Sequence, residues 1–155
     1  MTRATGPTWA ASTDVAARHK ARKRALDVLF QADVRDVDAL TVMSESEKLR
    51  EDEGDAPLNP YVADLVTGVV GHRDRIDEIL STYSLGWTLD RMPAVDRAIL
   101  RLGAYEILWG DIPTGVALDE ATTLARELST DDSPGFVNGL LARIAEQRST
   151  LDLEA

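Results

Sequence analysis

The stretch from Trp87 to Trp109, WTLDRMPAVDRAILRLGAYEILW, decides the fold because it is apolar on nearly every side after Pro93. On a helical wheel centred on Ile99, apolar side chains extend to both flanks. A helix with so wide an apolar surface packs against several neighbours at once, in the centre of a domain. Because Pro93 suits a first helical position, the sequence predicts a short turn at 89–91 and then a buried helix over 93–109.

Two acids of this helix need partners or a role. Glu106 lies on the same face as Ile99, and a buried carboxylate must be paired, so we expect a structural ion pair there. Asp96 lies at the flank of that face near the helix start, where the macrodipole favours an acid. A surface contact for a partner protein is the alternative reading of Asp96.

Length and composition favour one helical domain without catalytic chemistry. The chain has 155 residues, 44% hydrophobic and 28% charged, which is ordinary for a globular protein with a sizeable core. It has no apolar run of 18 residues and no signal-peptide pattern, so we expect no membrane span and a cytoplasmic protein. With no cysteine, two distant histidines and no phosphate loop or nucleophile elbow, we expect no metal, no cofactor and no enzyme.

The distribution of charge is more informative than the net charge of −10. Residues 1–35 hold seven Lys and Arg against three acids, whereas residues 36–155 hold ten against 24. A basic end on an acidic body indicates two kinds of contact, with nucleic acid at the basic end and a basic partner elsewhere.

The positive charge is concentrated near the start of a helix predicted over 14–35, in a basic collar formed by Arg18, His19, Lys20, Arg22, Lys23 and Arg24. Arg18 and Arg22 continue the apolar stripe of this helix outward. Lys20 and Arg24 point the opposite way, so the charges surround the helix end. Cations at a helix N-terminus cost on the order of a few tenths of a kcal/mol each, which phosphate contacts would offset. A merely solvated helix end is the alternative.

The remaining segments predict further helices. A stripe with an Asn-Pro start indicates one long helix over 59–82. Gly68 and Gly71, which precede His72, allow close packing or a bend, and the sequence leaves the role of His72 open. The acidic segment 36–59 contains a helix start at Ser44. Two more helices follow, over 114–128 and 133–147. Phe136 lies in the first turn of the last one, at the margin of its apolar stripe, where it is either a core-edge residue or a partly exposed contact.

No segment shows strand alternation, so the fold class is all-α: a single-domain bundle of six to seven helices around a buried central helix. The domain is expected over 14–148, between a disordered N-terminal tail at 1–13 and a C-terminal tail at 149–155.

The chain resembles the NusB family of transcription antitermination factors. The resemblance rests on four motifs: Ala17-Arg18-His19-Lys20-Ala21-Arg22-Lys23-Arg24-Ala25; Asp96-Arg97-Ala98-Ile99-Leu100-Arg101 with Tyr105-Glu106; Asp119-Glu120-Ala121 with Leu124-Ala125; and Asp131-Asp132-Ser133-Pro134-Gly135-Phe136-Val137-Asn138-Gly139. It covers about residues 14–148 in order, and the last motif is the most specific.

This resemblance implies binding of the boxA element of ribosomal-operon RNA, as a single strand, together with the small-subunit ribosomal protein that acts as NusE. It also implies action on RNA polymerase with other Nus factors. The RNA-binding residues it implies are Arg18, Lys20, Arg22, Lys23, Arg24, Phe136 and Asp132. The partner-binding residues it implies are Asp90 and Asp96. His19 and Lys20 depart from an all-arginine motif, which weakens the expectation of bidentate phosphate contacts there.

The physical chemistry of the residues agrees with an RNA-binding role, since single strands are bound by aromatic stacking and phosphate contacts. Some NusB-like proteins form homodimers, which would cover the basic helix. The alternative function is therefore a dimeric helical adaptor that binds proteins and not RNA. The basic collar and Phe136 separate the two hypotheses, because only RNA binding needs both.

Overall fold

The computed structural model describes residues 15–153, and the tail predicted at 1–13 lies outside them. The described residues form seven α-helices and two short 3₁₀ helices: α2 (Val15–Arg35), α3 (Ala39–Asp52), α4 (Pro60–Gly71), α5 (Arg73–Tyr83), η1 (Leu89–Arg91), α6 (Ala94–Trp109), α7 (Thr114–Leu128), α8 (Ser133–Glu146) and η2 (Arg148–Thr150). The all-α fold class predicted from the sequence is confirmed. None of the helices within residues 15–153 is long and apolar enough to cross a membrane.

The helix α6 is the centre of the bundle, as its sequence predicts. It contacts α2, α4, α5, α7 and α8. Its side chains from Ala98 to Ala104 are all buried, including the aliphatic part of Arg101. The short turn predicted at 89–91 is η1. Pro93 directly precedes Ala94, the first residue of α6.

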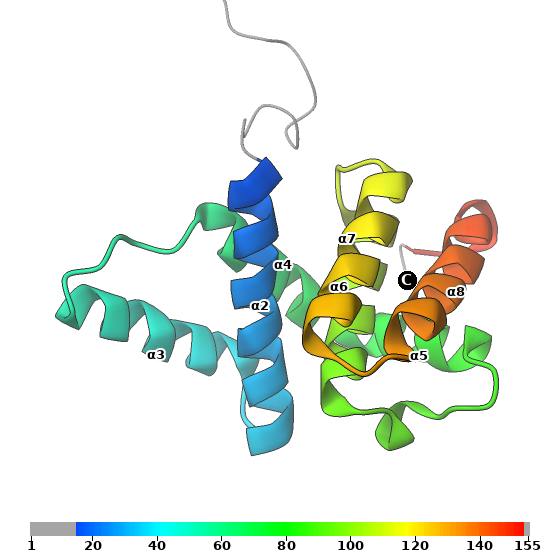
Figure 1. The fold of residues 1–155 in the computed structure, drawn as a ribbon, viewed down its shortest axis with the longest axis horizontal. Coiled ribbons are helices and arrows are strands. Elements are labelled where there is room, and N and C mark those ends of the chain that lie inside the picture. Colours follow the sequence, from blue (N-terminus) through cyan, green and yellow to red (C-terminus); the bar gives the residue numbers. More distant parts are fainter. Residues whose placement is uncertain (1–14, 154–155) are drawn as a thin grey trace, which may run out of the picture.

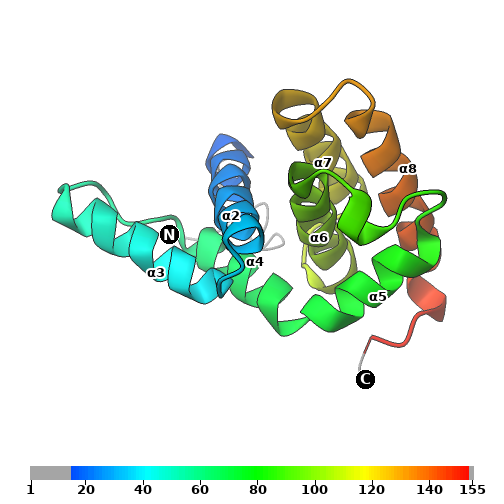
Figure 2. The same cartoon turned by 90° about the horizontal axis from the view of Figure 1, so that it is seen from below.

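The other helices form two groups around α6. In Figure 1, α2 and α3 lie on one side, and α7 and α8 lie on the other. Figure 2 shows α4 and α5 following one another beneath both groups. The contacts agree with this view, because α4 packs against α2 and α3, whereas α5 packs against α6 and α8.

The single helix predicted over 59–82 is wrong, because the chain breaks at His72 into α4 and α5. The His72 ring stacks on Trp109 of α6, with centroids 4.1 Å apart and planes inclined by 15°. Close packing one turn earlier fixes the position of this corner: a Cβ atom on Gly68 would lie 2.1 Å from the Tyr105 ring. Of the two roles expected for the glycines, close packing is seen at Gly68, and a bend that ends the helix follows Gly71.

The helix start predicted at Ser44 is also wrong. The helix α3 begins at Ala39, and the Asp38 carboxylate accepts a hydrogen bond of 2.9 Å from the backbone N–H of Leu40. Asp38 is a better N-cap here because starting at this point buries Ala39, Val42 and Met43 against the core.

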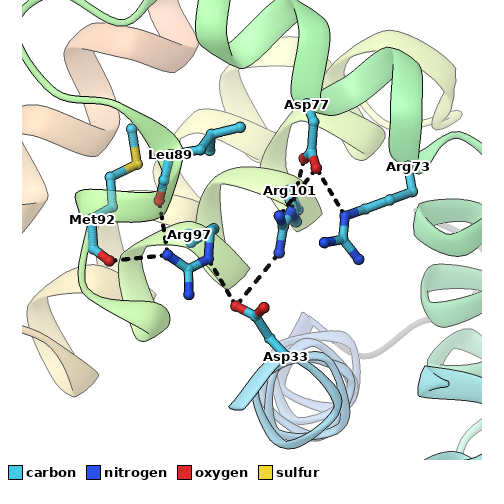
Figure 3. A network of polar contacts seen from close by, with 7 residues as sticks. All are labelled: Asp33, Arg73, Asp77, Leu89, Met92, Arg97 and Arg101. Atoms are coloured by element: carbon cyan, nitrogen blue, oxygen red, sulfur yellow. Dashed lines mark hydrogen bonds and ion pairs between the residues drawn. The ribbon is translucent and has the colours of Figure 1, made fainter. Parts of the chain in front are cut away.

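A network of ion pairs joins α6 to α2 and α5 (Figure 3). Arg97 donates from Nε to the Asp33 carboxylate of α2 at 2.8 Å, and Arg101 donates from Nε to Asp77 of α5 at 2.8 Å. Asp77 also accepts from Arg73, and Asp33 lies 3.6 Å from Arg101. The two arginines that interrupt the apolar surface of α6 thus attach it to α2 and to α5.

The same network fixes the turn before α6. The Nη1 group of Arg97 donates to the carbonyl oxygens of Leu89 and Met92, at 2.8 and 3.1 Å (Figure 3). Leu89 begins η1 and Met92 follows it, so the exposed side chain of Asp90 is carried by a turn with a defined position.

The end of the described chain packs back onto the bundle. Leu151 and Leu153 lie against the core, and the Leu153 carbonyl accepts from the Trp109 indole at 3.4 Å. The Asp152 carbonyl accepts from Arg75 at 2.8 Å. Packing therefore continues through part of the segment predicted as a C-terminal tail.

Candidate RNA-binding and partner-binding surface

The six residues of the basic collar do not surround a projecting helix end. The structure divides them into three pairs with different surroundings: Arg18 and Arg22 point into the protein, His19 and Lys23 face α7, and Lys20 and Arg24 face solvent. Only the third pair has the exposure that the sequence analysis expected of the whole collar.

The expected exposure of Arg22 is wrong. Its side chain is only 2% exposed, as is that of Glu106, and its Nε donates to both carboxylate oxygens of Glu106 at 2.9 and 3.0 Å. The Tyr61 hydroxyl donates to the same carboxylate, and Glu120 lies 3.4 Å from the guanidinium. The buried ion pair predicted for Glu106 is confirmed, and its partner is Arg22, one of the residues expected to bind RNA.

Arg18 is buried as well, which corrects the expectation that it extends beyond the core. Its guanidinium carbon lies 4.0 Å from the centroid of the Tyr61 ring, a cation–π distance. Burial and the neighbouring Glu106 charge both raise the pKa of Tyr61, so the phenol stays protonated and remains a hydrogen-bond donor. For Arg22, burial lowers the pKa, but the hydrogen bond and charge of Glu106 outweigh it and the net pKa is raised.

His19 and Lys23 connect α2 to an acidic edge of α7. The two ring nitrogens of His19 lie 2.8 Å from Glu120 and 3.1 Å from Glu127. Lys23 lies 3.5 Å from the same Glu127 carboxylate. Part of the basic charge is thus balanced within the fold, and RNA phosphates would compete with α7 for it.

Lys20 and Arg24 remain exposed on the outer face of α2. With Lys23 and Arg50, they line a groove of about 450 Å³ between α2 and α3, to which Leu49 and Leu58 add apolar surface. Acids also line this groove, among them Asp27, Glu53 and Asp55. Basic, acidic and apolar side chains therefore share the lining of this groove, and Lys20 and Arg24 are exposed among the basic ones.

Asp96 is fully buried, so the surface contact considered for it is wrong. Its carboxylate accepts hydrogen bonds from the hydroxyl groups of Ser129 and Ser133, the second at 2.9 Å. The two serines flank the turn between α7 and α8. Asp96 therefore holds this turn against the start of α6, and its side chain is not available to a partner in this structure.

Phe136 lies where the sequence analysis expected it, half-buried in the first turn of α8. The exposed Asp132 precedes it by one helical turn, and the carbonyl of Asp132 accepts from the Phe136 N–H at 3.3 Å. Asp90 is exposed on η1. Of the two acids assigned to a partner, only Asp90 thus presents its side chain to solvent.

Two residues of this region were missed by sequence reasoning. Trp87 meets the Phe136 ring nearly at right angles, with centroids 5.2 Å apart. Tyr61 connects the Arg18 guanidinium to the Glu106 carboxylate. In the sequence, the position of Trp87 between Gly86 and Thr88 indicates an aromatic side chain in a loop. Tyr61 follows an Asn-Pro helix start, and nothing else in the sequence points to its contacts.

Comparisons with known proteins agree with this architecture. The NusB family profile matches residues 19–146. The transcription antitermination protein NusB of Kineococcus radiotolerans is 58% identical over 138 residues, which cover 88% of this chain and 98% of that protein. The solved structure of Thermotoga maritima NusB superimposes with a TM-score of 0.70 at 33% identity, covering 86% of this chain and 97% of that one.

A third comparison is with a crystal structure of the antitermination factors NusB and NusE in complex with double-stranded RNA. It matches with a TM-score of 0.74 at 26% identity, covering 86% of this chain and 98% of that one. Sequence and structure thus agree over nearly the whole length of each relative. The chain belongs to the NusB family.

Proposed function

We propose that this chain is an RNA-binding transcription antitermination factor that takes up boxA-type single-stranded RNA of ribosomal operons. The observation that carries the proposal is the match along almost the entire length of NusB proteins, one of which was crystallised with RNA and NusE. The RNA in that complex is double-stranded, so the preference for a single strand is part of the proposal. The role is one of binding, carried out in the cytoplasm where transcription takes place.

The surface supports this function with fewer RNA-contacting residues than the sequence alone predicts. Lys20, Lys23 and Arg24 supply cations beside a groove, and Phe136 offers part of an aromatic ring near the start of α8. Exposed cations bind phosphates of any sequence, whereas aromatic rings stack on unpaired bases. Arg18 and Arg22 contribute by fixing α2 in place, since their side chains are buried.

We further propose that the ribosomal protein acting as NusE binds beside η1, where Asp90 is exposed. The acidic body of the chain suits a basic ribosomal protein, and complementary charge accelerates such association. RNA polymerase and other Nus factors would then be reached through the assembled complex.

Titration of a boxA-type RNA in increasing salt, with a scrambled single strand and a duplex for comparison, tests the proposal. If Lys20, Lys23 and Arg24 each neutralise one phosphate, the logarithm of affinity should fall with the logarithm of salt at a slope of about −2. The Lys20→Ala variant should flatten that slope by about 0.7 and weaken all sequences alike. Lys48→Ala, which removes an exposed cation of α3 that pairs with Asp52, is the matched control and should change neither.

The alternative, a dimeric adaptor that never meets RNA, predicts no binding by the monomer at any salt concentration. Sedimentation must accompany the titration, because a homodimer that covers α2 would mask the cations until it dissociates. Binding by the monomer with a salt slope near zero would contradict the phosphate contacts assigned to α2.

A further inference from the structure

The loop between α5 and η1 exposes a large aromatic side chain. Trp87 is 40% exposed and the neighbouring Leu85 is 72% exposed, although both are strongly apolar. The loop has a defined course: Gly86 adopts a positive φ of 84°, and the Ser84 hydroxyl donates to the Trp87 carbonyl. The exposure of Trp87 is thus a feature of an ordered turn.

Trp87 is placed directly against Phe136 of α8. The two ring centroids are 5.2 Å apart and the planes are inclined by 84°, an edge-to-face pair. Two rings at right angles form a corner. A flat group that stacks on one ring therefore places its own edge against the face of the other ring. It gains more contact than a single ring would provide.

The chemistry of the corner fits a nucleobase better than a phosphate. Neither the loop segment 84–89 nor the α8 segment 133–138 contains a cation, and the exposed acids Asp131 and Asp132 precede Phe136. Carboxylates repel a phosphate but accept hydrogen bonds from the amino groups of bases. Every base also has an apolar face that stacks on an aromatic ring.

We propose that Trp87 is a second base-stacking residue, which forms with Phe136 a corner that holds one unpaired base of the bound RNA. This inference rests on the proposed function and adds to it a specific contact from the α5–η1 loop. The cations of α2 would hold the RNA backbone, and the corner would hold a base.

Affinity for boxA-type RNA should be measured for Trp87→Ala, Phe136→Ala and the double variant. A stacked base is worth about 1–3 kcal/mol, so each single variant should lose about 5- to 150-fold in affinity with an unchanged salt slope. Because both rings contact the same base, the double variant should lose less than the product of the two single losses. Leu85→Ala, in the same loop and more exposed, is the matched control and should bind like the original chain.

Two further variants separate stacking from a structural role of the loop. Trp87→Phe keeps a ring and should retain most of the affinity, whereas Trp87→Leu keeps apolar bulk without a ring and should behave like Trp87→Ala. RNA should also quench tryptophan fluorescence, and the part of the quenching that disappears in Trp87→Phe reports on Trp87 itself. Circular dichroism melts establish that each variant is folded.

The outcomes distinguish the two proposals. If the original chain binds no RNA, the proposed function fails. Another outcome is that the original chain binds RNA and Phe136→Ala weakens binding, while Trp87→Ala binds normally. If RNA then also quenches the fluorescence of Trp87→Phe as strongly as that of the original chain, only the corner is overturned. Equal affinity of the Trp87→Leu and Trp87→Phe variants would likewise overturn it, because packing and not stacking would then explain the residue.

Discussion

Glu106→Ala is the substitution that tests the central ion pair most directly. Glu106 is nearly fully buried in α6, and its carboxylate receives two hydrogen bonds from Arg22 and one from Tyr61. Alanine removes the acceptor and leaves the guanidinium in the interior. Arg22 cannot move to solvent without displacing α2, since its side chain is as buried as that of Glu106.

The expected cost follows from that burial. Removing one partner of a buried ion pair costs about 3–5 kcal/mol, because the remaining charge is uncompensated. For a chain of this size, that loss lowers the melting temperature by roughly 6–20 °C. Glu127→Ala is the control: this exposed acid pairs with His19 and Lys23 of the same helix α2, so its removal should cost less than about 1 kcal/mol.

Urea unfolding followed by circular dichroism measures both losses. Replacing both partners with apolar residues, as Arg22→Met with Glu106→Leu, should recover much of the stability, since no charge is then stranded. A loss near zero for Glu106→Ala would refute the reasoning, because it would mean that Arg22 finds solvent. Arg22→Ala should likewise destabilise the fold, in contrast to Lys20→Ala, which should alter RNA binding in an intact fold.

Three more predictions concern the remaining acids and Tyr61. Asp90→Lys should weaken and slow association with the basic ribosomal partner in calorimetry and stopped-flow experiments while the melting temperature stays constant; unchanged affinity would remove Asp90 from the interface. Asp96→Ala should cost about 1–3 kcal/mol in urea melts by releasing the α7–α8 turn, and it should reduce RNA affinity by displacing Phe136; a stable variant would show that the serines hold the turn alone. Because the pKa of Tyr61 is raised by burial and by Glu106, the unfolded chain loses this proton first, so the free energy of unfolding should fall as pH rises above about 10. Tyr61→Phe should reduce that fall, and an identical alkaline profile would contradict the assignment.

The architecture could be predicted because α6 is apolar on so many sides that only a central position satisfies it. The residues at which the helices begin and end are harder to predict. The stripe from 59 to 82 continues through His72, so periodicity alone could not show that the ring would leave the helix to stack on Trp109. Likewise, Ser44 and Asp38 both have cap chemistry, and the choice between them depends on tertiary burial of Ala39.

The candidate site shows the same limit more sharply. The helical wheel placed Arg22 on the extension of an apolar stripe and Glu106 on a buried face, so both halves of the ion pair were visible. Their pairing was not, because they lie 84 residues apart in sequence. The sequence pattern therefore predicts phosphate contacts for the whole basic run, although the fold buries two of its members, Arg18 and Arg22. The burial of Asp96 could not be predicted for the same reason, since its partners Ser129 and Ser133 come from the distant α7–α8 turn.

The helix α6 supports the proposed RNA surface indirectly, through two buried acids that hold the elements carrying that surface. Glu106 fixes the basic first half of α2 through Arg22, and Asp96 fixes the turn that starts α8 and carries Phe136. Ten residues separate the two acids, which is about 15 Å along a helix. One rigid element therefore sets both the position of the exposed cations and that of the aromatic corner. A strand that binds at both places would depend on this spacing, so a substitution that loosens either acid should impair RNA binding without removing a single RNA contact.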